Sequence, residues 1–279
     1  MRKGLAAFWM VAAVPLLAMA CGGSGSTAQT SASPNGVSAA VLADLVPTGK
    51  LRVALTELPA AVAKADATGG LHGVGVDFGK ALAARLGVPF TPLGFASSGA
   101  ALAAVSEGTA DIAIVPSPAV QQTSMTATTP ILLIQHTYMV RGDSQLQSVQ
   151  DVDRTGIKVA SVMSDGHTPF LVSHLMHAQL VQVASNQTGL DDLRAGQVDA
   201  FASGRFVLTG ALNQVSGARL LTGNFFIGQI AVAAPSRHVD ASTFLQNFVN
   251  QQVSSGAIQT SINALGGPGF TVPGSATNG

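Results

Sequence analysis

The sequence has little cysteine, little charge and few aromatic residues, and each shortage excludes a class of protein. Its 279 residues include one cysteine, Cys21, so no disulfide can form within the chain and the fold must depend on its hydrophobic core. Only 10% of the residues are charged, and 14 basic residues balance 14 acidic ones, which leaves no basic face for nucleic acid. We therefore expect no nucleic-acid partner.

Several catalytic and ligand-binding signatures are also missing. The sequence contains no G-x-S-x-G motif, no P-loop and no cysteine after position 21, and we expect neither catalysis nor a cofactor. The one tryptophan, Trp9, lies near the N-terminus, and a cage for quaternary ammonium ligands needs several aromatic faces. Choline-like ligands are therefore disfavoured, although Phe95, Phe201 and Phe206 could line a modest apolar wall.

The first residues resemble an export signal. Two basic residues precede an apolar run from Leu5 to Leu17, and small residues lead to Cys21. The segment Ala18-Met19-Ala20-Cys21 resembles a bacterial lipobox, in which the cysteine is acylated. Ordinary secretion with cleavage after Ala20 is the alternative.

A flexible tether is predicted to follow the signal peptide. Residues 22–40 are rich in Gly, Ser, Thr and Ala and have almost no bulky apolar side chains. We expect a signal peptide over residues 1–20 and a tether over residues 21–45. With an acyl group on Cys21, the tether would hold the exported protein at a membrane.

Strand and helix patterns alternate in the next part of the chain. Apolar runs bounded by turn residues predict strands at Lys50–Leu55, Val88–Leu93 and Asp111–Val115. Between them, apolar residues at helical spacing predict two helices that end at Gly87 and Gly108. This alternation is typical of a parallel sheet covered by helices.

A second unit with the same alternation begins after a long strand-like run that follows Pro130. Its predicted helices and strands are, in order, helix Val149–Arg154, strand Ile157–Val162, helix Phe170–Ala178, strand Leu180–Val183, helix Gly189–Ala195, strand Val198–Ala202, helix Phe206–Val215 and strand Leu220–Leu221. The chain ends with a predicted strand, Gly228–Ala234, and two amphipathic helices, Ser242–Val253 and Ala257–Leu265.

These patterns predict an α/β protein of two lobes. Lobe 1 comprises residues 46–141 and 229–279, and lobe 2 comprises residues 142–228. Two crossings between the lobes, near residues 140–143 and 226–231, would form a hinge on which the lobes close over a ligand.

Several segments share their order and spacing with one known family. They are GKLRVAL, GLHGVGVDFGKALAARLGV and EGTADIAIV in the first lobe, SVQDVDRTGIKVA, HAQLV and RAGQVDAFASGR in the second, and VAAPSR and FVNQQVSSGAIQTSINALGG near the end. From Gly49 to Pro273 the chain thus resembles the extracellular solute-binding proteins of bacterial ABC uptake systems, specifically family 3, which handles amino acids and other small polar solutes.

This resemblance implies a periplasmic-binding-protein-like type II fold, in which a two-stranded hinge joins the lobes. It also implies a monomeric receptor that delivers a small solute to an ABC permease in the inner membrane. We expect an exported protein in the periplasm or at the cell surface, anchored through lipid on Cys21.

The charged anchors for an α-amino acid are absent from the positions where the family places them. Amino-acid binders have an arginine ten residues after the aspartate of the third strand, and counted from Asp111 that position is Gln121. The aspartate that holds the ligand's α-ammonium corresponds to Gly204, and Ile131 replaces a usual aromatic residue. The resemblance therefore implies an amino-acid-like solute, small organic acid or amine, and not a standard α-amino acid.

One loop of the second lobe matches a ligand-binding loop of the family. Ser164, Asp165, Gly166, His167 and Thr168 correspond to the loop that receives the ligand's carboxylate before a helix. Free N–H groups and the helix dipole favour an anion there, whereas Asp165 adds a negative charge. An ordinary turn with a helix cap is the alternative.

Four further side chains are candidates from the resemblance. Arg205 could bind an acid from the second lobe or form a surface salt bridge. Glu57, one of two glutamates, follows the first strand and would favour an amine if it faces the cleft, or else be a solvated loop charge. Ser117 directly follows the third strand, and Phe95 could supply an apolar contact.

Two other functions remain open. His167, His174 and His177 are seven and three residues apart and would share one face of a continuous helix, which a metal-binding receptor could use, although Pro169 interrupts that segment. A few relatives of the fold are extracellular dehydratases acting on prephenate-like acids, so an enzyme is the second alternative.

Overall fold

The structure is a computed structural model that describes residues 35–57, 62–121 and 123–274. All of these residues belong to one compact part of the chain, residues 32–279. The predicted signal peptide, Cys21 and most of the predicted tether lie outside the described residues. Within these ranges, no helix is long and apolar enough to cross a bilayer.

In the described part of the chain, eleven strands form one mixed sheet and two form a separate hairpin. The strands of the sheet are β1 (Leu51–Thr56), β4 (Phe90–Phe95), β5 (Ile112–Pro116), β6 (Met125–Ala127), β7 (Leu132–Val140), β8 (Lys158–Val162), β9 (Gln179–Val183), β10 (Ala200–Gly204), β11 (Arg219–Leu220), β12 (Phe226–Pro235) and β13 (Phe270–Thr271), and those of the hairpin are β2 (Lys64–Ala65) and β3 (Leu71–His72).

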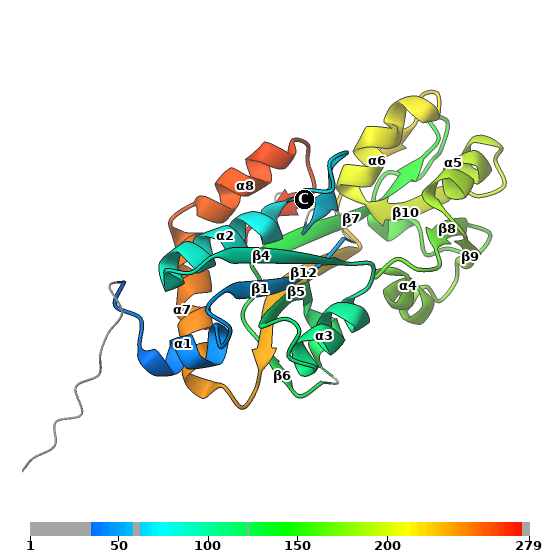
Figure 1. The fold of residues 1–279 in the computed structure, drawn as a ribbon. Helices are drawn as coiled ribbons and strands as arrows, with labels where there is room; N and C mark the ends of the chain where they lie inside the picture. The colour runs from blue at the N-terminus through cyan, green and yellow to red at the C-terminus, as the bar shows by residue number, and fades with distance from the viewer. Residues whose placement is uncertain (1–34, 58–61, 122, 275–279) are drawn as a thin grey trace, which may run out of the picture. The chain divides into compact units, whose positions relative to one another are not determined.

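The order across the sheet is β4-β1-β5-β12-β7-β10-β8-β9 (Figure 1). Strands β4, β1 and β5 run parallel, as do β10, β8 and β9. Between these two groups, β12 and β7 run antiparallel to each other and to their outer neighbours. We call the β4-β1-β5 side the first lobe and the β10-β8-β9 side the second lobe.

Helices cover both lobes (Figure 1). They are α1 (Ala39–Leu45), α2 (Val74–Leu86), α3 (Ser98–Ser106), α4 (Thr168–His174), α5 (Asn186–Arg194), α6 (Arg205–Ala211), α7 (Val239–Ser254) and α8 (Ala257–Leu265), with short 3-10 helices η1 (Ser117–Val120), η2 (Val149–Asp151) and η3 (Leu212–Gln214). Both predicted α/β units are therefore present, with element ends displaced by a few residues.

Both lobes repeat one helix, turn and strand unit. Ser97 and Ser185 cap α3 and α5, because each hydroxyl accepts a hydrogen bond from a backbone N–H three residues later. After each helix a glycine takes the left-handed conformation, Gly108 with φ of 72° and Gly196 with φ of 70°, which a side chain would disfavour. The turns return the chain to the sheet as β5 and β10.

The core fills both faces of each half of the sheet. Along β1, Val53 and Leu55 pack with α2, α7 and α8, whereas Ala54 points to the other face and packs with α3. In the second lobe, Phe201 packs on the α5 and α6 side and its neighbours Ala200 and Ala202 on the α4 side. Burial on both faces explains why these strands are apolar runs without polar alternation.

The crossings between the lobes lie in β7 and β12. Strand β7 pairs with β12 from Leu132 to His136, and with β10 from His136 to Val140. Strand β12 also pairs with β5 at residues 230–233. The first crossing is thus around His136. The prediction of residues 140–143 was wrong, because Val140 is already paired with a strand of the second lobe.

The C-terminal segment adds a third strand to this crossing. Phe270 of β13 pairs with Ile134 of β7, and the Gln135 N–H donates to the Gly269 carbonyl at 2.8 Å. The Phe270 ring also lies 5.1 Å from that of Phe206 on α6. The first lobe's C-terminal segment therefore contacts the second lobe beside the hinge.

The predicted tether ends too late. Residues Ala39–Leu45 form α1, which Ser38 caps by accepting from the Val41 N–H at 3.3 Å. Val41 and Leu45 are buried, and α1 packs against α7. Two apolar residues four positions apart give this short segment a buried face, which its composition did not indicate.

Candidate ligand-binding site

The carboxyl ends of the parallel strands from both lobes meet at the crossing of β7 and β12. On the first-lobe side, Pro116 at the end of β5 pairs with Ile230 of β12. On the second-lobe side, Gly204 at the end of β10 pairs with His136 of β7, which also pairs with Phe226. Ligands of open α/β sheets bind outside the carboxyl ends of the strands. The loops that leave β5, β8 and β10 are thus the candidate site.

The first lobe places three candidate residues at these strand ends. The Glu57 N–H, directly after β1, donates to the Phe95 carbonyl at 3.0 Å, so the two residues are neighbours. Ser117, directly after β5, donates from its hydroxyl to the Gln229 carbonyl of β12 at 3.3 Å. Ser117 therefore lies beside the hinge.

Gln121 is the residue directly after η1. Its backbone N–H donates to the Pro118 carbonyl at 3.3 Å, and its exposed side chain makes no hydrogen bond with any described residue. Its amide is therefore available to a ligand, but carries no charge.

The loop after β8 divides into exposed and buried parts. Ser164 and Gly166 are exposed, whereas His167 and Thr168 are buried. Thr168 donates to the Val162 carbonyl at 2.6 Å, and its hydroxyl is 2.7 Å from that of Ser161. These two side chains are thus held within their own lobe, and α4 after them has seven residues. The exposed part of the loop is the part that a ligand can reach.

Asp165 is half-buried in this loop. Burial raises the pKa of its carboxyl above the ordinary value. No described residue donates a hydrogen bond to the carboxylate, and the nearest basic atom is His167 Nδ1 at 4.0 Å.

Arg205 begins α6 directly after β10. Its guanidinium donates to the Gly223 carbonyl at 2.8 Å and to Asn224 Oδ1 at 3.1 Å. Burial lowers its pKa, and no carboxylate among the described residues pairs with it, which removes the surface salt bridge as an explanation. Arg205 fastens the loop before β12 to the second lobe.

A cluster of histidine and phenylalanine rings lies where the two lobes join. The His136 ring is 4.8 Å from that of His167 and 5.3 Å from that of Phe226. Phe225 lies 5.7 Å from His167, and Phe170 lies 5.3 Å from Phe226. We call these five residues the hinge ring cluster.

Both histidines of the hinge ring cluster are neutral at neutral pH. Burial lowers the pKa of His136 from 6.5 to about 4. Burial, and then the neighbouring His136, lower the pKa of His167 from 6.5 to about 3. Since the cluster joins residues far apart in sequence, no local motif indicated it. The earlier suggestion of an apolar wall was wrong for Phe201, which is a core residue of the second lobe.

The three histidines considered as an alternative metal site do not come together. Helix α4 ends at His174, so His177 lies beyond the helix and bonds to Asp153 at 3.3 Å. His174 stacks on Phe170, with ring centroids 3.8 Å apart, while His167 is buried against Ser161. Among the described residues, no group of three potential ligands could hold a metal ion.

Ser161, His167 and Asp165 lie in the same sequence of contacts as a hydrolase triad, but their burial and distances do not suit catalysis. The Ser161 hydroxyl is 3.1 Å from His167 Nε2 and is fully buried, so no substrate can reach it. Asp165 lies 4.0 Å from His167 Nδ1, beyond hydrogen-bond distance.

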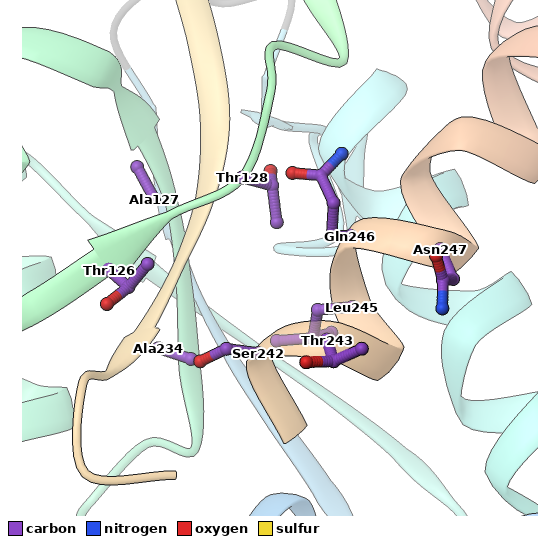
Figure 2. A pocket seen from close by; sticks show the side chains of 9 residues that line it. All are labelled: Thr126, Ala127, Thr128, Ala234, Ser242, Thr243, Leu245, Gln246 and Asn247. Atoms are coloured by element: carbon purple, nitrogen blue, oxygen red, sulfur yellow. The ribbon is translucent and has the colours of Figure 1, made fainter. Parts of the chain in front are cut away.

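Two open pockets lie away from the candidate site at the carboxyl ends of β5, β8 and β10. One of about 330 Å³ lies between β6, β12 and α7 (Figure 2). It is lined by uncharged side chains, Thr126, Ala127, Thr128, Ala234, Ser242, Thr243, Leu245, Gln246 and Asn247. The other, of about 570 Å³, lies between α1 and the end of α2. Neither contains a predicted site residue.

Comparison with known proteins identifies the fold. No family model matches the chain, and no curated protein matches its sequence. Among solved structures, a putative binding component of an ABC transporter from Wolinella succinogenes, complexed with lysine, matches with a TM-score of 0.63 and 16% identity, over 78% of this chain and 95% of that one.

Two further structures agree with this match. An amino acid ABC transporter substrate-binding protein from Streptococcus pneumoniae, bound to L-arginine, has a TM-score of 0.57 and 22% identity over 79% of this chain and 95% of that one. An ancestral amino acid-binding protein, a precursor of cyclohexadienyl dehydratase, has a TM-score of 0.60 and 18% identity over 80% and 98%. The chain therefore has the expected type II periplasmic-binding-protein-like fold.

Proposed function

We propose that this protein is the substrate-binding component of an ABC uptake system and captures a small polar solute between its two lobes. The observation that carries this proposal is the convergence of strand ends on the β7 and β12 crossing. The side chains of Gln121 from the first lobe and Asp165 from the second make no hydrogen bond there with a described residue. The likeness to solute-binding proteins supports the same role, and an ABC permease would receive the solute.

Capture follows from the way the hinge joins the lobes. A solute that touches Ser117 or Gln121 and also the loop at Ser164 contacts both lobes only when they are closed. Those contacts stabilise the closed state relative to the open one and shift the population toward it. We propose a binding protein and not an enzyme, because the described residues hold no accessible nucleophile paired with a base.

The proposed solute is not a standard α-amino acid held in the usual way. Gln121 is neutral, and the Arg205 guanidinium is occupied by the loop at Gly223 and Asn224. Neither residue offers the free guanidinium that a bidentate grip on a carboxylate requires.

Export, lipid anchoring on Cys21 and a monomeric state are further proposals. Export and anchoring rest on the apolar run that precedes Cys21 and on the Gly/Ser-rich segment after it, whereas the monomeric state rests on the resemblance alone. A periplasmic or cell-surface position would place the receptor where it meets solutes before the permease. Mass spectrometry of the purified membrane fraction tests this, and an unmodified Cys21 would exclude the anchor.

A thermal-shift screen tests the proposed function. We expect at least one small solute among amino acids, carboxylic acids, amines and nucleobase-like heterocycles to raise the melting temperature. A ligand at 100 times its Kd stabilises a folded protein by about 2.7 kcal/mol, which such a screen detects readily. If saturating amounts of every class leave the melting temperature unchanged, the receptor function is wrong.

Two substitutions test the placement of the site. Gln121→Ala should weaken solute binding without changing stability, because its side chain is exposed and makes no hydrogen bond with a described residue. Arg205→Ala should weaken binding and also lower the free energy of unfolding by about 1–3 kcal/mol, since it removes charged hydrogen bonds to two loop residues. Calorimetry and urea unfolding measure the two effects. Normal binding by both variants would show that the site lies elsewhere.

A further inference from the structure

The half-buried Asp165 carboxylate lacks a partner within the described residues. Another loop carboxylate of the second lobe does have hydrogen-bond donors, because Asp153 accepts from the N–H groups of three consecutive residues at distances of 2.7 to 3.1 Å. Asp165 has no such donor, and its nearest basic atom, on the neutral His167, is 4.0 Å away. A partly desolvated carboxylate without a donor is costly unless a cation or donor arrives from outside.

The hinge ring cluster contacts this loop through His167, whose Nδ1 is 4.0 Å from the Asp165 carboxylate. Within the cluster, Phe170, Phe225 and Phe226 are half-exposed. An aromatic face attracts a cation, and the attraction grows when the cation is desolvated. Phe225 and Phe170 each have one face stacked on another ring, Tyr138 and His174 respectively, so only their other faces are open to a cation. An unpaired carboxylate in the loop that joins this cluster favours an amine or guanidinium and disfavours a carboxylate.

The first lobe has a second carboxylate, Glu57, that lacks a partner among the described residues. The Glu57 side chain lies over Gly94 of β4 and makes no hydrogen bond or ion pair with a described residue. Beside it, Thr56 is fully buried and its hydroxyl has no hydrogen-bond partner among the described residues. Basic groups on the nearby hairpin, Lys64 and His72, are exposed and do not pair with Glu57.

We infer that the solute carries a positively charged amine or guanidinium group, which binds at the unpaired Asp165 carboxylate, and that it carries no α-carboxylate. The inference depends on the proposed receptor function, because it names the chemical class of that receptor's ligand. Glu57 on the opposite lobe would contact the same cation or a second one when the lobes close.

Calorimetry with matched probes tests the inference. Butylamine and 1-butanol have nearly the same shape and differ in one positive charge, while agmatine and arginine share a guanidinium and differ in the α-carboxylate. We expect butylamine or agmatine to bind, and its uncharged or carboxylate-bearing counterpart to bind at least ten times more weakly. Binding of the cation should weaken as salt is raised.

Variants separate a direct contact from a general effect of charge. Asp165→Asn should weaken binding of the cationic probe at least tenfold, and Glu57→Gln should weaken it less. Asp143→Asn removes the same charge from an exposed position beyond the end of β7 and should leave binding unchanged. Circular dichroism spectra of the variants check that each one folds.

The outcomes distinguish this inference from the proposed function. If only carboxylic acids or neutral solutes bind, or if Asp165→Asn binds the cation as well as the original protein does, the inference is wrong and the receptor function stands. If no probe and no solute of any charge class binds, the receptor function is wrong as well.

Discussion

Asp111→Ala is expected to lower the free energy of unfolding by about 3–5 kcal/mol, the usual cost of removing one partner from a buried ion pair. The Asp111 side chain is 2% exposed, and that of Arg52 is 15% exposed. Asp111 Oδ1 accepts from Arg52 Nη2 at 2.6 Å, and Oδ2 accepts from the Arg52 backbone N–H at 2.7 Å. Alanine would leave a poorly solvated guanidinium and an unpaired N–H between β1 and β5.

The second lobe supplies a matched control. Asp199 stands before β10 as Asp111 stands before β5, and its Oδ2 accepts from the Lys158 backbone N–H at 2.8 Å. No side chain pairs with Asp199 among the described residues, and it is half-exposed. Asp199→Ala should therefore cost only about 1 kcal/mol, the typical net value of one hydrogen bond. Urea unfolding of both variants measures the difference. Equal losses of unfolding free energy in the two variants would show that the ion pair between Arg52 and Asp111 does not stabilise the protein.

These two aspartates explain why part of the fold was predictable. Each lies fourteen residues after a capping serine, 111 − 97 and 199 − 185, with a glycine turn between them. The backbone N–H of each aspartate donates a hydrogen bond to the neighbouring parallel strand, that of Asp111 to the Arg52 carbonyl and that of Asp199 to the Lys158 carbonyl. The helices, the turn at Gly108 and the apolar strands follow local sequence patterns, so these patterns indicated them correctly, whereas the capping serines were not predicted.

Features that depend on distant pairing were not predictable in the same way. The crossing lies around His136 because residues of β7 pair with both β12 and β10, and nothing in the run ILLIQHTYMV marks where one partner replaces the other. Strand β13 is two residues long and exists only because β7 offers an edge beside Ile134. Helix α1 was missed because it is only seven residues long and directly follows a Gly/Ser-rich segment.

The candidate site shows the same division. Ser117 and Gln121 were located by their distance from the third strand, and Arg205 was chosen as a second-lobe arginine near the cleft. The structure places each of them directly after a strand or its following 3-10 turn. Sequence spacing could not show that Arg205 binds the loop at Asn224, or that His167 faces inward to Ser161. The direction of a side chain depends on packing between segments that the sequence separates.

Acid is expected to destabilise this protein well above the pH at which ordinary carboxylates titrate. His136 and His167 have folded-state pKa values of about 4 and about 3, against 6.5 in the unfolded chain. The unfolded state therefore binds protons first as the pH falls below 6.5. The stabilisation is complete above pH 6.5 and is lost as the pH falls toward the folded pKa values.

Urea unfolding between pH 7.5 and 5 measures this effect. From pH 6.5 to 5, each histidine should contribute a loss of roughly 2 kcal/mol, at 1.36 kcal/mol per pH unit. Asp66, Asp151 and Asp153 have lowered pKa values and act only below this window, whereas Asp165 has a pKa raised by burial and acts in the opposite sense.

The double variant His136→Gln, His167→Gln isolates the two groups. Glutamine keeps a polar side chain of similar length but does not titrate, so the variant's stability should change by less than about 1 kcal/mol between pH 7.5 and 5. A variant as acid-sensitive as the original protein would show that other groups bind the protons. Because His136 and His167 lie where the lobes join, protonation would place two positive charges at the contact between β7 and the second lobe.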